Sequence, residues 1–574
     1  MVDLSYNAKI LLKERYLLKD KEGNIIETPE EMFRRVAKHI ASVELLYNKT
    51  IDEALDFENK IYEALNNLEF MCASPFLFNS NARTNQLFSC FTLPIHDSLE
   101  SIFKTLYDSA KIFQSGGGVG CNFSEIRPKN DFVRKIPNGA SGPISFMELF
   151  DTMCNVMKQS FTRRGAIMSL LNCNHENIYD FITCKNIEGN LSNMNLSIPI
   201  TDEFMDAVEN NKDFNLINPR TSKVTKTIKA KELWDLIIKH SWNNGEPSLI
   251  FIDTINKANP TPKEKIISVN PCSEANLLPY ESCCLSSINL SKFVSYGKIN
   301  YKRLTEVIKL VIRFLDNAID INKYPLKEIE EKTKSNRKIG LGVMGWADLL
   351  VKLEIRYDSD EAIKLAEEVM GFIQKTAKEA SIELGKEKGN FPNKENSIYK
   401  DIPYMRNATV TSIAPTGSIS IIADCSSGIE PIFSLITKRN IESTLGKSLL
   451  EINSNVKDIL KKEGKWLEIK KALKEASENN SCIKLPSYIY EKIPTAQKIA
   501  PIWHLKMHSA FQKFVDMAIS KTINLPNNAT IEEVSEIYIY AYKNGIKGTT
   551  VYRDGSRKHQ LLVENSGACP TCPS

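Results

Sequence analysis

The 574-residue sequence lacks both a strong charge excess and a long apolar run. Its 74 Lys and Arg against 70 Asp and Glu give a formal net charge of +4, too small for a surface that coats nucleic acid or anionic lipid. The uncharged stretch 407–423 contains Pro415, Gly417 and several Ser and Thr, and falls short of the roughly 20 apolar residues of a membrane helix. We therefore expect no nucleic-acid partner and no membrane span.

An export signal is also missing, because charged residues recur throughout the opening segment MVDLSYNAKILLKERYLLKDKEGN. We expect a cytoplasmic protein whose 13 cysteines stay reduced and serve chemistry, metal binding or core packing. An odd number of cysteines argues against a complete disulfide framework. Hydrophobic residues at 42% and charged residues at 25% are ordinary for a globular chain and exclude collagen-like, disordered and coiled-coil classes.

Helical and β-type patterns alternate along the chain. Thr28 and Glu31 form a capping box before a periodic helix, and Thr530 and Glu533 form a second one near the end. Between them, long amphipathic helices such as 361–384 alternate with β-branched runs at 196–200, 249–252, 266–269, 409–413 and 419–422. This rhythm predicts an α/β barrel or sheet. The Lys- and Glu-rich stretch 447–478 is interpreted as a solvated helical excursion.

The densest chemical constellation is Asn270-Pro271-Cys272-Ser273-Glu274, which follows the apolar run IISV. In an extended segment, residues 270, 272 and 274 project to the same side, so an amide, a thiol and a carboxylate would converge. Such a trio suits a sulfur-centred reaction beside a general base. The alternative is a buried cysteine beside a turn.

Three further motifs allow two interpretations each. The glycine-rich SGGGVG (115–120) could hold an anion with its backbone NH groups, or be a flexible turn. Pro415-Thr416-Gly417-Ser418, between two β-type runs, could hold phosphate or form a tight turn. Cys569 and Cys572 form a CxxC pair that favours a dithiol shuttle over a half zinc site. His504 and His508 have no accompanying ligand pattern, so we expect them to be packed or solvated, and we expect no metal site.

Many ordered motifs resemble those of one family, the adenosylcobalamin-dependent (class II) ribonucleotide reductases. They are QLFSCFTLPIHDSLESI, SGGGVGCNFSEIRPKNDFVR, ASGPISFMELFD, TRRGAIM, NPCSEANLLPYESCCLSSINL, GLGVMGWADLL, APTGSIS, SSGIEP, SKTINLP and KGTTVYRDGSR. The resemblance implies an α/β fold, the ten-stranded α/β barrel of the ribonucleotide reductase type. A helical N-terminal region would span 1–70, the catalytic barrel 71–558, and a mobile tail with the CxxC pair 559–574.

The resemblance also implies residue roles. Cys272 would become the thiyl radical that takes the 3′ hydrogen of the ribose, Glu274 would accept the 3′-OH proton, and Asn270 would hydrogen-bond within the site. Cys90 and Cys283 would be the redox pair that ends as a disulfide. Cys569 and Cys572 would then re-reduce that disulfide and pass the oxidation to thioredoxin or a glutaredoxin-like protein.

Nucleotide contacts follow by the same resemblance. The implied substrate residues are Ser74, Ser89, Gly118, Pro415, Thr416, Gly417, Ser418 and Ile419. The implied deoxynucleotide effector residues are Asp97, Ser98, Arg127 and Arg134, and Arg163 and Arg164 fall in the loop that relays effector identity.

The chain departs from the family pattern at several positions. Ser160-Phe161 replaces a usual Gly pair, Ser273 replaces a Gly, and Cys284 and Ser286 replace Asn and Gly. The bulkier pair at 160–161 stiffens and enlarges the loop, which argues against the ordinary relay of effector identity to the substrate site. Cys284 could compete with Cys283 for Cys90. We also expect that the N-terminus has no room for an ATP-binding cone.

Two rival functions are weighed against this one. A class I-like large subunit would take its radical from a separate metal-containing subunit through a tyrosine pair, but the chain has Val551 before Tyr552 at that position. A catalytically silent nucleotide-binding paralogue is disfavoured by the three active-site thiols and the CxxC tail. No glycyl-radical segment and no DxHxxG cobalamin motif is visible, so adenosylcobalamin follows from the resemblance alone. We expect diphosphate substrates and a homodimer.

Overall fold

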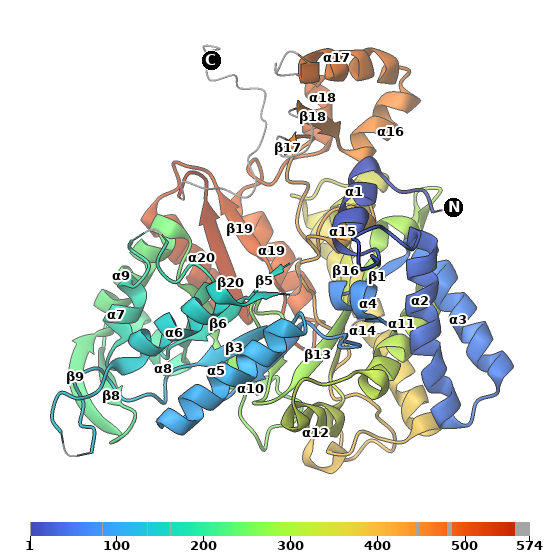
Figure 1. Cartoon of the computed structure of the whole chain (residues 1–574). Helices are drawn as coiled ribbons and strands as arrows, with labels where there is room; N and C mark the ends of the chain where they lie inside the picture. The colour runs from blue at the N-terminus through green and yellow to red at the C-terminus, as the bar shows by residue number, and fades with distance from the viewer. Residues whose placement is uncertain are drawn as a thin grey trace.

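A computed structural model describes residues 2–556 apart from 83, 135, 160–162, 188, 442–446 and 479–484. The N-terminal part is helical, as expected, with α1 (Tyr6–Arg15), α2 (Pro29–Ala41) and α3 (Ile51–Asn66). The Thr28 side chain accepts from the Glu31 backbone while Glu31 reaches back, so the expected capping box is confirmed. These helices stand beside the barrel, and α1 lies over its upper rim (Figure 1).

Five parallel strands form one half of the barrel. They run in the order β2 (Cys90–Leu93), β3 (Gly118–Asn122), β6 (Ile167–Leu170), β7 (Met194–Ile200) and β10 (Ser248–Phe251). Helices in the connections between these parallel strands cover the sheet, as parallel sheets require. The β-branched runs expected at 196–200 and 249–252 are therefore confirmed as strands.

The second half runs antiparallel to the first. It contains β13 (Ser282–Asn289) and β16 (Ile339–Met344), which pair in parallel, and β19 (Thr522–Leu525) and β20 (Gly548–Arg553), which also pair in parallel. Residues 411–413 close the ring, because Thr411 bridges to Leu341 of β16 and Ile413 bridges to Ile519, just before β19. The halves meet at two antiparallel seams, β2 with β13 and β10 with β20. The expected α/β fold with a ten-stranded sheet is confirmed.

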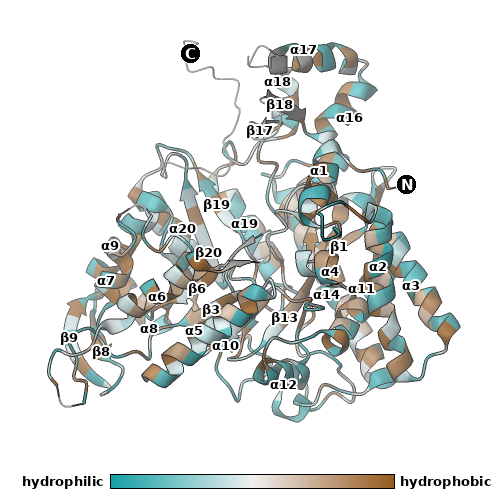
Figure 2. Ribbon diagram, in the orientation of Figure 1, coloured by the Kyte–Doolittle hydropathy of each residue, from teal (hydrophilic) through white to brown (hydrophobic). Residues whose placement is uncertain are grey.

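Helices cover the outside of this ring. They include α5 (Leu99–Gln114), α6 (Gly142–Val156), α9 (Ala230–Asn244), α11 (Tyr301–Ile321), α14 (Asp360–Lys388), α19 (Pro501–Gln512) and α20 (Ile531–Lys543). Most of their apolar side chains turn inward and most of their polar side chains outward (Figure 2), which is the pattern of amphipathic surface helices; α5 also exposes some apolar side chains. No helix in the described ranges has the length and apolarity to cross a membrane.

The remaining elements are mostly short, and β1 (Phe70–Cys72) among them pairs antiparallel with β13 as a further strand of the ten-stranded sheet. They are η1 (Ser42–Tyr47), β1 (Phe70–Cys72), α4 (Ser74–Asn79), β4 (Lys158–Gln159), β5 (Arg163–Arg164), α7 (Ile178–Thr183), α8 (Asp202–Glu209), β8 (Asp213–Asn218), β9 (Lys223–Lys229), α10 (Ile252–Lys257), β11 (Ser268–Val269), β12 (Asn276–Leu277), η2 (Leu290–Phe293), β14 (Val294–Ser295), β15 (Lys298–Ile299), α12 (Lys327–Asn336), α13 (Trp346–Lys352), η3 (Lys394–Asn396), α15 (Ile419–Ile422), β17 (Ile436–Ile441), β18 (Lys447–Ile452), α16 (Ser454–Lys462), α17 (Trp466–Glu478) and α18 (Ser487–Lys492).

Two local expectations are wrong. Residues 419–422 form the short helix α15 and not a strand, because the Ser420 NH bonds back to the Thr416 carbonyl and the Ala423 NH to Ile419. The stretch 447–478 is not wholly helical, since it begins with β18, which forms an antiparallel hairpin with β17 before α16 and α17. A short run of β-branched residues fits a helix or a strand when the sequence does not reveal a partner strand.

A polar loop passes through the interior of the barrel. It is built on the antiparallel hairpin of β11 and β12, and we call residues 268–277 the inner hairpin. Val269 packs with Met168, Leu170, Ile250 and Leu278 inside the ring. The inner hairpin approaches β3 so closely that a Cβ atom on Gly120 would lie 1.7 Å from the Val269 carbonyl oxygen. Glycine at 120 is therefore a condition for the hairpin's position.

We predict that Gly120→Ala lowers the free energy of unfolding by about 1–3 kcal/mol, because the added methyl must push the inner hairpin away from β3. Denaturant unfolding followed by far-UV circular dichroism measures this. Gly371→Ala in α14 is the matched control, because there the nearest atom is the Phe514 ring at 3.3 Å, which can turn aside. Equal stability of the Gly120→Ala protein and the native protein would contradict this account of the hairpin.

Candidate active site

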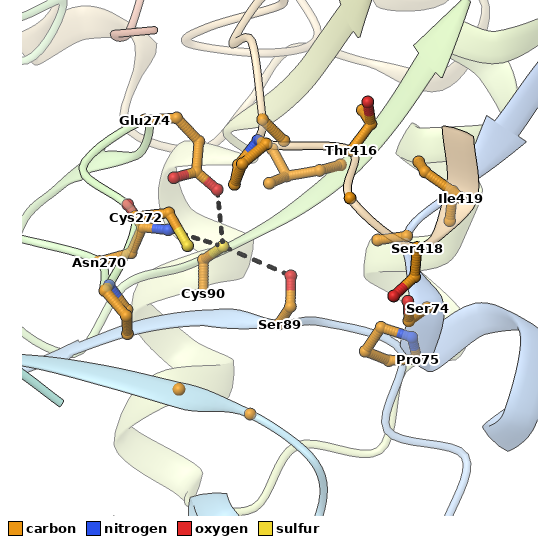
Figure 3. Close-up of a pocket in the computed structure, with 18 of the residues that line it drawn as sticks. Ser74, Pro75, Ser89, Cys90, Asn270, Cys272, Glu274, Thr416, Ser418 and Ile419 are labelled. Carbon is orange, nitrogen blue, oxygen red and sulfur yellow. Dashed lines mark hydrogen bonds between the residues drawn. The ribbon is translucent and has the colours of Figure 1, made fainter. Parts of the chain in front are cut away.

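A cavity of about 190 Å³ opens at one end of the barrel around the inner hairpin. Its wall comes from the start of β2, the glycine-rich turn before β3, the inner hairpin, β13 and the loop that leads into α15 (Figure 3). The lining includes Ser74, Ser89, Cys90, Gly118, Asn270, Cys272, Glu274, Pro415, Thr416, Gly417, Ser418 and Ile419. Every expected catalytic and substrate residue except Cys283 is in this set.

The tip of the inner hairpin is a tight turn. The Ser273 NH donates to the Asn270 carbonyl at 3.0 Å, and Ser273 has a left-handed φ of 64°. The Asn270 side-chain oxygen accepts from the Ala275 NH at 2.9 Å and closes the turn. The expected extended geometry is therefore wrong, although Asn270, Cys272 and Glu274 all line the cavity as expected. The backbone folds around the thiol, and alternation along a strand has no part in the convergence.

Residues far apart in the sequence fix this turn in place. The Asn195 side chain of β7 donates to the Pro271 carbonyl at 2.9 Å. The Glu274 carbonyl accepts from the Ser412 hydroxyl at 2.8 Å and from the Ala518 NH at 3.0 Å. Neither Asn195 nor Ser412 was expected from the sequence, because nothing near them in the chain signals a contact with the hairpin. The barrel wall thus holds the catalytic candidates through their backbone.

Cys90 is the centre of the polar contacts in the cavity. Its sulfur accepts from the Asn270 amide at 3.1 Å, lies 3.4 Å from the Ser89 hydroxyl, and donates to Glu274 Oε1 at 3.7 Å. The Cys272 sulfur points toward Cys90 from the hairpin tip (Figure 3). Cys272 is partly exposed to the cavity, whereas Cys90 is buried. The arrangement places a reachable thiol, a buried thiol and a carboxylate around one small space.

The β2–β13 seam brings two cysteines face to face. Cys90 and Cys283 are register partners in the antiparallel pair, and both belong to the inner cluster with Ala275, Leu277 and Met517. Directly opposed residues of an antiparallel pair have side chains on the same face. The Cys284 thiol instead bonds to the Leu315 carbonyl of α11 on the outer face. Cys283 and Cys284 therefore point to opposite faces of β13, and it is Cys283 that faces Cys90.

The two opposed thiols are held in their neutral form. Burial raises the pKa of Cys90 well above the ordinary thiol value, and the nearby Glu274 carboxylate adds to the shift. Burial and the neighbouring Cys284 likewise raise the pKa of Cys283. A low-dielectric site disfavours the thiolate. Both groups therefore carry a proton at neutral pH.

The opposite end of the cavity offers hydroxyl and NH groups. The Thr416 hydroxyl accepts from the Gly428 NH at 2.9 Å and donates to the Ser427 hydroxyl at 3.2 Å, which fixes the loop 415–419. A Cβ atom on Gly417 would meet nothing within 4 Å, so the space above this loop is open. Among the described lining residues, Lys, Arg and His are absent. An anion here would be bound by neutral donors.

Two of the expected effector residues, Asp97 and Ser98, lie at the start of α5, and Arg127 and Arg134 lie on the segment after β3. Asp97 and Arg127 form an ion pair with Nε–Oδ2 at 2.9 Å, and the Ser98 hydroxyl caps α5 by accepting from the Ser101 NH. Arg134 is exposed on the segment between β3 and α6. Arg163 and Arg164 lie in β5, whose backbone pairs with β4, but their side chains fall outside the described part of the chain, as do residues 160–161. Cys569 and Cys572 also lie outside the described residues.

Three secondary expectations can be placed. His504 and His508 are fully buried in α19, as expected, and burial lowers the pKa of each to about 3. Val551 is fully buried, and Tyr552 beside it is partly exposed. None of the ten cysteines in the described part of the chain forms a disulfide.

Two family descriptions match the chain. Ribonucleotide reductase, all-alpha domain, matches residues 2–85, and ribonucleotide reductase, barrel domain, matches residues 88–552. The boundary between them falls between the N-terminal helices and β2. Together they cover the whole folded part described above.

Curated relatives agree with this assignment. A vitamin B12-dependent ribonucleoside-diphosphate reductase of Thermoplasma acidophilum is 43% identical, and the alignment covers 98% of this chain and 80% of that protein. A protein of the same name from Mycobacterium tuberculosis (strain CDC 1551 / Oshkosh) is 43% identical over 99% and 81%. A ribonucleoside-diphosphate reductase subunit alpha of Chlamydia muridarum is 28% identical over 97% and 59%. The chain belongs to the ribonucleotide reductase family.

Proposed function

We propose that the chain reduces ribonucleoside diphosphates to 2′-deoxyribonucleoside diphosphates, with adenosylcobalamin as its radical source. The observation that carries the proposal is the single cavity in which Cys272, Cys90 and Glu274 meet, with Cys283 opposite Cys90 and a loop of NH and hydroxyl donors at the other end. Two relatives at 43% identity bear the name vitamin B12-dependent ribonucleoside-diphosphate reductase, which supports both the cofactor and the substrate class.

The residues around Cys272 fit such a cofactor. Cys272 and its neighbour Pro271 line the open cavity, so a reactive group from outside the chain can approach the thiol. Val551 is fully buried where the class I relay needs a tyrosine, so radical transfer through a phenol pair lacks one member. Adenosylcobalamin, when bound, supplies the organic radical chemistry that a side chain cannot generate. Cys272 and Pro271 are the residues that would face it.

The chain's own groups then account for the reduction. The Cys272 sulfur, as a thiyl radical, takes the 3′ hydrogen of the ribose, and the Glu274 carboxylate accepts the 3′-OH proton while Asn270 orients the polar groups. One of the protonated Cys90 and Cys283 thiols provides the proton for the departing 2′-OH, which leaves as water, and the pair supplies the hydrogen that replaces it at C2′ together with the two electrons of the reduction. The two thiols end as a disulfide. Glu274 returns its proton to the 3′ oxygen. Cys272 finally returns its hydrogen to C3′.

Substrate and effector binding are proposed at separate places. Ser74, Ser89, Gly118 and residues 415–419 would hold the substrate, with the diphosphate on the loop 415–419. Asp97, Ser98, Arg127 and Arg134 would bind the deoxynucleotide effector, and Arg163 and Arg164 would relay its identity. Because the start of α5 carries the Asp97–Arg127 pair beside an exposed surface, a charged ligand can reach it.

Partners complete the proposal. The face of α5 exposes Leu99, Phe103 and Tyr107 at helical spacing, and an apolar stripe of this kind is a typical protein interface. We assign it to a second copy of the chain, which makes the enzyme a homodimer. Cys569 and Cys572 would re-reduce the Cys90–Cys283 disulfide and exchange with thioredoxin or a glutaredoxin-like protein in the cytoplasm.

We predict that Cys272→Ser abolishes dCDP formation, with a loss of at least about 10⁴-fold, because the serine O–H bond is too strong for hydrogen transfer. CDP binding by equilibrium dialysis and the thermal unfolding midpoint should stay close to those of the native protein. Cys184→Ser is the matched control, since Cys184 is another half-buried free thiol, at the end of α7. Turnover by the Cys272→Ser protein would refute the assignment.

The radical source gives a second prediction. Purified chain with CDP, a small dithiol and adenosylcobalamin should form dCDP without any added subunit, because Val551 leaves no tyrosine pair for a relay. Omitting the cofactor should remove all turnover. If turnover instead needs a separate metal-containing subunit and is indifferent to adenosylcobalamin, the class I-like alternative holds.

The strand register gives a third prediction. After one turnover without reductant, peptide mapping should find a disulfide between Cys90 and Cys283, since these residues are opposed across the seam. Cys284→Ser should leave this link and single-turnover dCDP yield unchanged, because the Cys284 thiol is on the outer face. A dominant Cys90–Cys284 link in the native protein would overturn the pairing.

A further inference from the structure

We propose that Tyr16 of the N-terminal region is a positioning residue for substrate, because its phenol hydroxyl orients the Ser74 hydroxyl toward the diphosphate. The inference rests on the proposed function, in which Ser74 contacts the nucleotide. It extends the substrate site beyond the cavity wall into a segment that does not itself line the cavity.

The contact is direct. Tyr16 follows α1 and is 4% exposed, and its hydroxyl oxygen lies 2.9 Å from the Ser74 Oγ atom. Ser74 is the first residue of α4 and lines the cavity (Figure 3). The two residues are 58 positions apart in the sequence. A buried phenol usually has a hydrogen-bond partner, and here that partner is a residue of the proposed substrate site.

The hydrogen bond has a chemical consequence for anion binding. A serine hydroxyl has one proton to donate and can accept from another group at the same time. When the Tyr16 hydroxyl donates to Ser74 Oγ, the Ser74 proton remains free to point into the cavity. Because the described cavity lining has no Lys, Arg or His, the affinity for the diphosphate depends on each hydroxyl that donates to it. By donating to Ser74 Oγ, Tyr16 therefore leaves the Ser74 hydroxyl proton for the diphosphate.

The N-terminal region fixes this geometry at both ends of α4. Arg35 of α2 donates to the Leu77 carbonyl at 2.9 Å and to the Ser80 carbonyl at 2.7 Å, at the end of α4. Arg35 also binds Glu27 at 2.7 Å. The start of α4 meets Tyr16, so α4 is held between two anchors from the same region.

The position of Tyr16 is itself secured. The Glu27 carboxylate accepts from the Leu18 NH at 2.9 Å, two residues after Tyr16. Helix α1 packs against α15, the short helix that follows the loop 415–419 (Figure 1). Ala8 and Leu12 of α1 are fully buried. The segment that carries Tyr16 therefore contacts both structures that flank the diphosphate end of the cavity.

A double-mutant cycle tests the proposal. In the holoenzyme with adenosylcobalamin, Tyr16→Phe should raise KM for CDP by about 2- to 12-fold and leave kcat unchanged, the range expected for one net hydrogen bond. Ser74→Ala should raise KM at least as much, because it removes the donor itself. The double variant should match Ser74→Ala, since Tyr16 acts only through Ser74. Equilibrium dialysis of CDP without cofactor should show the same order of affinities.

Tyr542→Phe is the control. Its hydroxyl bonds to Asp202 at 3.0 Å on the other side of the barrel, so its loss should leave CDP affinity unchanged. A Tyr16→Phe protein that binds CDP like the native one overturns the inference, whether or not Ser74→Ala weakens binding. Equal weakening by Tyr542→Phe, or additive effects of the two substitutions in the cycle, also overturns it. Failure of the proposed function is separate, because it appears as no dCDP formation by the native protein.

Discussion

The structure depends on one constraint, that a polar loop inside a barrel must have its backbone groups paired. Buried carbonyl and NH groups without partners are costly. The Pro271 carbonyl of the inner hairpin is paired by Asn195 from the first half of the barrel, and the Glu274 carbonyl is paired by Ser412 and Ala518 from the second. The same contacts therefore join both halves of the barrel to the inner hairpin and hold Cys272 inside the ring.

The antiparallel seam between the halves sets the sulfur geometry. Strands within each half are parallel, and the seam where β2 meets β13 is antiparallel and puts Cys90 directly opposite Cys283. Alternation along β13 then decides which of the adjacent cysteines faces inward. A one-residue shift of register would exchange Cys283 for Cys284 and send the proposed redox partner of Cys90 to the α11 side. The seam's register is thus as important to the chemistry as the identity of the residues.

Local sequence patterns predict helices and strands, but they do not predict contacts between residues that are far apart in the sequence. The capping boxes at Thr28 and Thr530 and the strands at 196–200 and 249–252 follow from sequence neighbours alone, and all are present. The run 419–422 resembles a strand because its three isoleucines fit both structures, but the turn before it starts a helix. Asn195, Ser412 and Tyr16 gave no signal, since each acts on a segment more than 50 residues away.

The lack of Lys, Arg and His in the described cavity lining connects the thiols to the N-terminal helices. A free cation beside Cys90 or Cys283 would favour their thiolates, which cannot donate the proton that the departing hydroxyl needs. Lys338, whose charge lowers the pKa of Cys283, is fully buried in an ion pair with Glu281 at 2.7 Å, which also opposes its effect. Because the described lining has no Lys, Arg or His, the proposed diphosphate would be bound there by neutral donors. Neutral donors need fixed orientations to compete with water, and the anchors from Tyr16 and Arg35 supply such orientation to α4. In the proposed function, the helical region therefore contributes to the substrate site by holding α4.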